Sequence, residues 1–164
     1  MPVPAYSWTR KGRVHQLRVP TRWGRQGRLN LIGTLSLEEG AERLEYRMVE
    51  GPCHTKEVVG YLDALAEEAE RGGKPVVVVL DNAPFHTAGA VRGRRTDWEE
   101  RGLRLRYLPS YCPHLNPIEG VWRRLKGFLM PRRFYDSLAE LKRAVLSALR
   151  LLGAVEIQCQ LGGT

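Results

Sequence analysis

Two stretches of the chain alternate apolar and charged residues, which is typical of half-exposed β-strands. Residues 43–48 read Arg-Leu-Glu-Tyr-Arg-Met, and in residues 103–108 Arg104 and Arg106 alternate with apolar positions. Residues 29–36 predict a further strand, and the Glu38–Gly40 segment predicts a hairpin turn before the strand at 43–48. Because Arg104 and Arg106 fall on the same side of the strand at 103–108, that strand would carry one basic face.

A different pattern, five consecutive apolar residues, follows Pro75 at Val76–Leu80. A short β-branched run without alternation predicts a strand that is buried on both faces of a sheet, as in α/β folds. The run stops at Asp81 and Asn82. Asp81 would then lie at the carboxyl end of a central strand, where α/β proteins usually place their ligands.

Helical periodicity predicts four helices. They are a helix from Thr55, its N-cap, to about residue 71 with Gly72 as the stop, one at 88–101, one that contains Glu119, and a last one capped by Ser137 with Glu140. A weak strand at 14–19 would precede them. The order favours an α/β fold with a mixed sheet flanked by helices. We take residues 1–152 as one domain and residues 153–164, which carry no usable pattern, as a C-terminal tail.

The sequence around Glu119 has two interpretations. In the first, Asn116 is an N-cap, Pro117 takes the first helical position, and Glu119 closes a capping box without any further function. In the second, the same geometry fixes Glu119 on the first turn of a helix, with Arg123 and Lys126 on the same face. A carboxylate beside two cations is what a metal and phosphate site would need.

The apolar residues of the Glu119 helix predict one stripe that packs against the sheet. They are Ile118, Val121, Trp122, Leu125, Phe128 and Leu129. Trp98 and Trp122 are expected in the core rather than as platforms for stacking bases.

The charge distribution favours a polyanionic partner. The formal net charge is +8, and residues 1–30 contain seven Lys and Arg residues and no acid. Clustered arginine is the electrostatic footprint of nucleic-acid binding, because each neutralised phosphate releases counterions. We therefore expect DNA or another polyphosphate as the partner.

The remaining composition indicates a cytoplasmic protein. No apolar run is long enough for a membrane helix, and residues 1–30 contain no stretch typical of a signal peptide. Cys53, Cys112 and Cys159 are widely spaced, which predicts free thiols. Cys112 and His114 resemble half of a zinc site, but no second pair completes it.

Two blocks of sequence resemble a known family. The segments DNAPFH at 81–86 and LPSYCPHLNPIEGVWRRLK at 108–126, with Glu119 38 positions after Asp81, resemble the catalytic domain of mariner-like DDE transposases of the bacterial insertion sequence 630 branch. SWTRKG at 7–12 and NLIGTLS at 30–36 extend the resemblance over most of the chain. It implies a ribonuclease H-like fold in which three carboxylates hold two divalent metal ions, Mg²⁺ or Mn²⁺, for DNA strand cleavage and joining.

By this resemblance Asp81 is the second carboxylate, which bridges both metal ions, and Glu119 is the third, which holds one of them. Asn82, His86 and Asn116 would hold the ligands in place or contact DNA. Four cations would hold the DNA strand: Arg104, Arg106, Arg123 and Lys126.

The chain departs from the family pattern at the first carboxylate. The family places that Asp on a strand upstream of the segment that SWTRKG resembles, and none of residues 1–30 is acidic. We therefore expect the first, central strand of the sheet to be missing, which would leave unpaired strand edges. An upstream-encoded transposase half, or a second copy in a homodimer, would be the protein partner.

Two alternatives to an active transposase remain open. The chain would be a DNA-binding module whose basic surface works while the catalytic site is idle, or a remnant of a broken insertion sequence without a function of its own. Preserved DNA binding without metal-dependent cleavage would favour the module.

Overall fold

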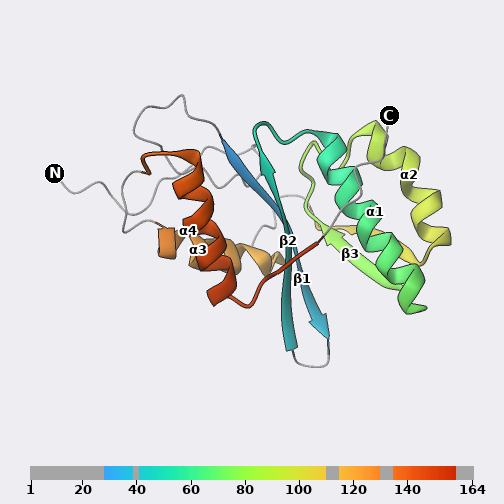
Figure 1. The fold of residues 1–164 in the computed structure, drawn as a ribbon. Coiled ribbons are helices and arrows are strands. Elements are labelled where there is room, and N and C mark those ends of the chain that lie inside the picture. The colour runs from blue at the N-terminus through green and yellow to red at the C-terminus, as the bar shows by residue number, and fades with distance from the viewer. Residues whose placement is uncertain (1–27, 39–40, 110–114, 130–134, 158–164) are drawn as a thin grey trace.

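A computed structural model describes residues 28–38, 41–109, 115–129 and 135–157 of the chain (Figure 1). The elements, in order, are β1 (Leu29–Glu38), β2 (Ala41–Glu50), α1 (Thr55–Gly72), β3 (Val76–Leu80), α2 (Gly89–Glu100), β4 (Leu103–Tyr107), α3 (Ile118–Leu129), α4 (Leu138–Leu151) and β5 (Val155–Glu156). This is an α/β arrangement, as predicted. The strand expected at 14–19 lies outside the described residues.

The first sheet is built on a long hairpin. β1 and β2 pair antiparallel, from Leu29 opposite Glu50 to Glu38 opposite Ala41. In β2 Leu44 and Tyr46 are buried, but the predicted alternation is broken, because Glu45 between them is only 5% exposed and forms an ion pair with Arg43 at 2.8 Å. Within residues 153–164, for which the sequence offers no pattern, β5 pairs parallel with β2, and the Ile157 amide donates to the Tyr46 carbonyl at 2.8 Å.

The second sheet consists of β3 and β4, which pair parallel from Val76 opposite Leu103 to Leu80 opposite Tyr107. The predicted basic face of β4 is confirmed, because Arg104 and Arg106 are exposed while Leu103 and Leu105 are buried.

The prediction that β3 is buried on both faces is wrong. Val78 is buried, but Val77 is 57% exposed and Val79 is 55% exposed. The cause is that α1 and α2 pack their apolar residues on the Val78 side, whereas the side of Val77 and Val79 stays open to solvent. Apolar residues on consecutive positions therefore do not establish burial on both sides.

Each sheet has its own hydrophobic core. In the first, α3 and α4 pack on β1 and β2 through residues that include Val121, Leu125, Val145 and Leu149. In the second, α1 and α2 pack on β3 and β4 through residues that include Leu62, Val78, Trp98 and Leu105.

Helix α1 contacts both sheets. Besides its place in the second core, the Tyr61 hydroxyl hydrogen-bonds the Thr34 hydroxyl of β1 and donates to the Glu45 carbonyl of β2 at 3.2 Å. Ile32 of β1 packs against the second core as well. The two sheets thus lie against one helix, although no backbone ladder joins β1 to β3 among the described strands.

Trp98 and Trp122, the two tryptophans expected in the core, both pack against core residues. Trp98 is fully buried. Trp122 is half-buried and packs on β1 at Gly33, where an added Cβ would lie 2.8 Å from the Trp122 ring.

The prediction that Phe128 belongs to the apolar stripe of α3 is wrong. Phe128 is 51% exposed, because the buried positions of α3 are Val121, Leu125 and Leu129.

The ends of α1 differ from the predicted ends by one residue. His54, rather than Thr55, is the N-cap, and its amide donates to the Glu57 carboxylate at 2.8 Å. At the other end Gly72 is still helical, and Gly73 takes the left-handed conformation with φ +61°. A glycine adopts that conformation without the steric cost that a Cβ would impose.

The Ser137 half of the predicted capping box is confirmed, because the Ser137 hydroxyl accepts from the Glu140 amide at 3.1 Å, while the Glu140 carboxylate accepts from the Asp136 amide at 2.9 Å. Replacing Ser137 with alanine should lower the free energy of unfolding by about 1 kcal/mol, because the amide loses its acceptor. The shift of the urea midpoint measures this. Ser147→Ala, inside the same helix and away from its N-terminus, is the matched control, and an equal loss there would contradict a capping role.

Candidate active site

Asp81 is the first residue after β3, where the backbone leaves the sheet. The Leu108 amide still donates to the Leu80 carbonyl at 2.8 Å, so the ladder between β3 and β4 continues to the last residue before Asp81. Asp81 then turns the chain, because its Oδ1 accepts the Ala83 amide at 3.1 Å. Such a bond is a local turn that an aspartate side chain forms readily. The predicted position at the carboxyl end of a strand is confirmed, but β3 is not central among the described strands, since it pairs there only with β4.

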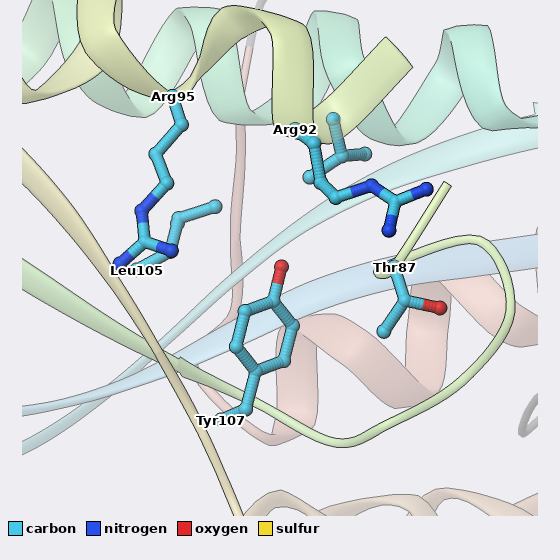
Figure 2. Close-up of a pocket in the computed structure, with 6 residues that line it drawn as sticks. Thr87, Arg92, Arg95, Leu105 and Tyr107 are labelled. Atoms are coloured by element: carbon cyan, nitrogen blue, oxygen red, sulfur yellow. The ribbon is translucent and has the colours of Figure 1, made fainter. Parts of the chain in front are cut away.

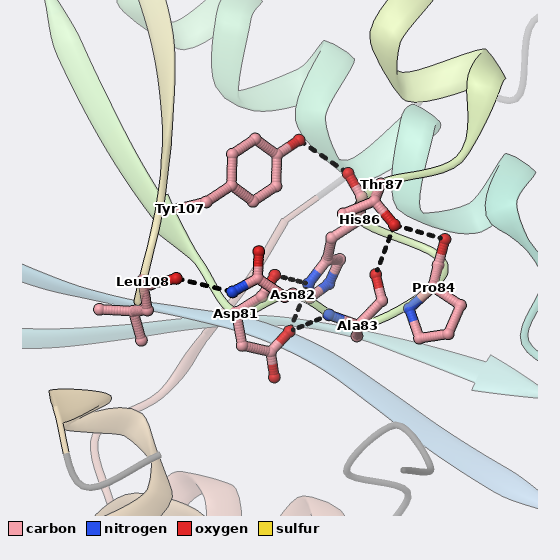
Figure 3. A network of polar contacts seen from close by, with 8 residues as sticks. All are labelled: Asp81, Asn82, Ala83, Pro84, His86, Thr87, Tyr107 and Leu108. Atoms are coloured by element: carbon pink, nitrogen blue, oxygen red, sulfur yellow. Dashed lines mark hydrogen bonds and ion pairs between the residues drawn. The ribbon is translucent and has the colours of Figure 1, made fainter. Parts of the chain in front are cut away.

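His86 lies against Asp81 (Figure 3). Its Nδ1 is 2.7 Å from Asp81 Oδ1 and 3.3 Å from the Asp81 carbonyl oxygen. Both oxygens can only accept, so Nδ1 carries the proton and donates it. The side chains of both residues are about three-quarters shielded from solvent. The imidazole therefore fixes the orientation of the carboxylate.

Two hydrogen bonds fasten this loop to the end of β4. The Asn82 Nδ2 donates to the Leu108 carbonyl at 2.6 Å, and the Tyr107 hydroxyl donates to the His86 carbonyl at 2.8 Å. The Asn82 side chain is thus directed at Leu108 rather than at Asp81 (Figure 3). It holds the loop that carries the carboxylate.

Tyr107 is a site residue that sequence reasoning missed, although it fixes His86. The available signal was its position at the end of the alternating strand, two residues after Leu105 and on the same face. An alternation that places a tyrosine at a strand end predicts a buried ring with a hydroxyl that reaches a polar partner. Here the partner is the backbone of the neighbouring loop.

Glu119 lies in the first turn of α3 and is half-buried. α3 begins at Ile118, and the carbonyls of Asn116 and Pro117 accept the amides of Glu119 and Gly120, each at 3.1 Å. Asn116 and Glu119 are therefore neighbours at this helix start. Capping of the helix by the Asn116 side chain stays a prediction, as does the approach of Glu119 to Asp81.

The four cations expected to contact DNA are all exposed. Arg104 and Arg106 lie on the open face of β4, and Arg123 and Lys126 lie on α3. The first pair shares its side of the second sheet with Val77 and Val79. Their contact with a DNA strand stays a prediction.

The two predicted ligands have the chemistry that suits a hard divalent cation. Mg²⁺ and Mn²⁺ prefer carboxylate oxygens such as those of Asp81 and Glu119. No group of three or more His, Cys, Asp or Glu residues in the described ranges is arranged to hold a metal ion. Both lone pairs of Asp81 Oδ1 accept hydrogen bonds, from Ala83 and His86, so metal binding by both oxygens would require these bonds to rearrange.

The sequence predicts that the three cysteines are free thiols. Cys53 is confirmed as a free thiol, and Cys112 and Cys159 lie outside the described residues. Burial, with the charge of Glu57 nearby, raises the pKa of the Cys53 thiol above its ordinary value. It is therefore protonated and unreactive near neutral pH.

None of the described helices is both long enough and apolar enough to cross a bilayer.

Comparison with known proteins identifies the family. A search among curated proteins finds no match to this chain. The family model of the DDE superfamily endonucleases matches residues 1–142. This range includes Asp81, Glu119 and the loop that His86, Asn82 and Tyr107 hold in place. Because the match spans well over half of the 164 residues, the chain belongs to the DDE superfamily of endonucleases.

Proposed function

We propose that the chain is the catalytic part of a mariner-like transposase of the insertion sequence 630 type, which cuts and joins DNA strands with the help of divalent metal ions. The observation that carries the proposal is the position of Asp81, at the carboxyl end of β3 and oriented by His86 at 2.7 Å, within a DDE endonuclease domain. The proposed fold is ribonuclease H-like, and the proposed place of action is DNA in the bacterial cytoplasm.

Asp81 and Glu119 are the proposed metal ligands. A pair of Mg²⁺ or Mn²⁺ ions would supply activation of the attacking hydroxyl and stabilisation of the leaving oxygen. His86 holds the Asp81 carboxylate in one orientation, and residues that orient a ligand in this way support both affinity and activity. Asn82 holds the loop through Leu108, and Asn116 lies beside Glu119 at the start of α3.

The first carboxylate of the family pattern is proposed to come from another polypeptide, an upstream-encoded half of the transposase. Two observations support this. Residues 1–30 contain no acid, and among the described strands β1 and β3 belong to different sheets although both pack against α1. A strand that paired with both β1 and β3 would join the two sheets. An apolar strand that ends in Asp-Glu, encoded in any frame upstream of Met1, is the expected source, and sequencing that DNA tests it.

DNA is the proposed substrate and partner, with Arg104, Arg106, Arg123 and Lys126 as the residues that hold its backbone. All four are exposed, and the net charge of +8 favours a polyanion. Contacts of this kind position the strand without reading its sequence.

A second candidate function is DNA binding without catalysis. It is favoured by the absence of a three-residue metal-binding cluster among the described residues. The two candidates differ in one measurable property, since both bind DNA and only the first cuts it.

The experiment is a plasmid cleavage assay with the chain and the upstream-encoded polypeptide that supplies the first carboxylate. Nicked and linear products should form with Mg²⁺ or Mn²⁺ and disappear when EDTA removes the ions, because the scissile phosphate is then no longer activated. Binding is followed in parallel by a gel-shift assay in EDTA. Cleavage that persists in EDTA would contradict the metal-dependent mechanism, and binding without cleavage under all conditions would establish the second candidate.

A further inference from the structure

A small cavity lies between α2, β4 and the loop that follows Asp81. It has a volume of about 170 Å³ and is lined by Thr87, Val91, Arg92, Arg95, Leu105 and Tyr107. Figure 2 shows that the side chains of Arg92 and Arg95 reach down from α2 on either side of the Tyr107 ring. Val91 and Leu105 are almost fully buried, so the cavity has a fixed apolar floor and a cationic rim.

The two arginines lie one helical turn apart and share one face of α2. Arg95 donates through Nε to the Glu99 carboxylate at 3.1 Å, which leaves the planar fork of its terminal amino groups for other acceptors. Other arginines in and just after α2 have acidic partners: Arg94 with Asp63, and Arg101 with Glu70. No carboxylate in the described ranges lies within ion-pair distance of Arg92. Arg92 thus carries a positive charge at the cavity that no acid of the described residues neutralises.

The hydroxyl groups of the cavity connect it to the candidate active site. Tyr107 donates to the His86 carbonyl, and the imidazole of the same His86 donates to Asp81. The Thr87 hydroxyl makes two long bonds of 3.4 Å, to the carbonyls of Ala83 and Pro84. Bonds of that length are weak, so the hydroxyl can reorient toward an anion at little cost. An anion in the cavity would lie one loop away from Asp81.

We propose that Arg92 and Arg95, with the Thr87 hydroxyl, form a binding site for a DNA backbone phosphate that flanks the phosphate to be cut. The proposal rests on the proposed function, since it takes DNA as the ligand. Planar guanidinium groups match the geometry of phosphate oxygens. A flanking phosphate held here would fix the strand relative to the loop that presents Asp81.

The test measures DNA binding by the full chain in EDTA as a function of salt, so it does not depend on metal binding or cleavage. The logarithm of the association constant for duplex DNA falls with the logarithm of the salt concentration by about 0.9 for each phosphate contacted. Arg92→Ala should reduce this slope by about 0.9, and Arg92→Ala with Arg95→Ala by more. Arg92→Lys should restore most of it, because the charge is kept.

Two controls separate this site from general electrostatics and from the catalytic proposal. Arg143→Ala removes an exposed cation on α4, the helix that packs on the first sheet, and should leave the slope unchanged. Because every slope is measured in EDTA, where no divalent ion is bound, the result does not depend on the proposed metal ligands. A double variant that keeps the full slope, or an equal reduction in Arg143→Ala, would overturn the proposal. Circular dichroism spectra that match the parent chain confirm that these substitutions leave the fold intact.

Inorganic phosphate serves as a second probe. Added at constant ionic strength, it should weaken DNA binding by the parent chain and have less effect on the double variant, because it competes for the same guanidinium groups. Competition that is equal in both proteins would also count against the site.

Discussion

Glu119→Gln is expected to abolish metal-dependent DNA cleavage while leaving DNA binding nearly unchanged. Glutamine keeps the length and shape of the side chain but removes the charge that a divalent ion requires. Loss of a residue that merely orients a metal ligand typically costs about 10–100-fold in affinity or activity, so loss of the ligand itself should cost more than about 100-fold. The measurement is the cleavage rate of the chain together with the polypeptide that supplies the first carboxylate, with binding followed by gel shift.

Asp81→Asn is the companion variant, and it should have the same effect. Asparagine keeps an Oδ1 that accepts the bonds from Ala83 and His86, so the loop should keep its conformation. Glu100→Gln, at an exposed acid at the end of α2, is the matched control and should cleave at the parent rate. If Glu119→Gln lost cleavage and binding to the same extent, Glu119 would be a structural or DNA-contacting residue rather than a metal ligand.

Trp98→Ala is expected to give the largest loss of stability, about 3–5 kcal/mol, which is the usual cost of truncating a large buried aromatic side chain. Trp98 is 0% exposed and lies in the core between α1, α2 and the second sheet. Its indole nitrogen also donates to Asp63 Oδ1 at 2.7 Å. The free energy of unfolding from urea titration measures the loss.

Trp98→Phe separates packing from hydrogen bonding in this core. Phenylalanine keeps most of the ring volume and loses only the donor, while Asp63 keeps its bond to Arg94 at 2.6 Å. The hydrogen bond alone is worth about 1 kcal/mol, and a smaller ring adds a modest packing loss. If Trp98→Phe were as damaging as Trp98→Ala, the bond to Asp63 rather than the filled core would hold α2 in place.

The elements that the sequence predicted well are those in which one local pattern decides the outcome. The alternation in β4 separates exposed arginines from buried leucines, and the Ser137 cap forms as expected. Both depend on neighbours within a few positions, which the sequence displays directly. The position of Asp81 was predictable for the same reason, because the apolar run ends there.

The features that the sequence could not predict depend on residues that are distant in the chain. Val77 and Val79 satisfy the pattern of a buried strand, yet they are exposed because α1 and α2 cover the other side of β3. β5 is two residues long and pairs with β2 across more than a hundred positions. A segment this short has no periodicity from which a strand can be predicted.

The candidate site likewise has one part that the sequence predicts and one part that it does not. The pairing of His86 with Asp81 spans five residues and follows from one turn of the loop. The hydrogen bond from Tyr107 to His86 joins the ends of two strands and is visible only in the folded chain. The approach of Glu119 to Asp81 brings together elements from the two different cores, and it stays a prediction.

The convergence of Asp81 and Glu119 on one metal site is the central claim, and cleavage of the protein by iron-generated radicals tests it most directly. Fe²⁺ replaces Mg²⁺ in the full chain, and ascorbate with peroxide then produces hydroxyl radicals that cut the nearby backbone. The account predicts cuts beside both Asp81 and Glu119, suppressed together by excess Mg²⁺ and absent in Asp81→Asn. Cuts beside only one of the two residues, or cuts at both that survive Asp81→Asn, would show that the two carboxylates do not share a metal site.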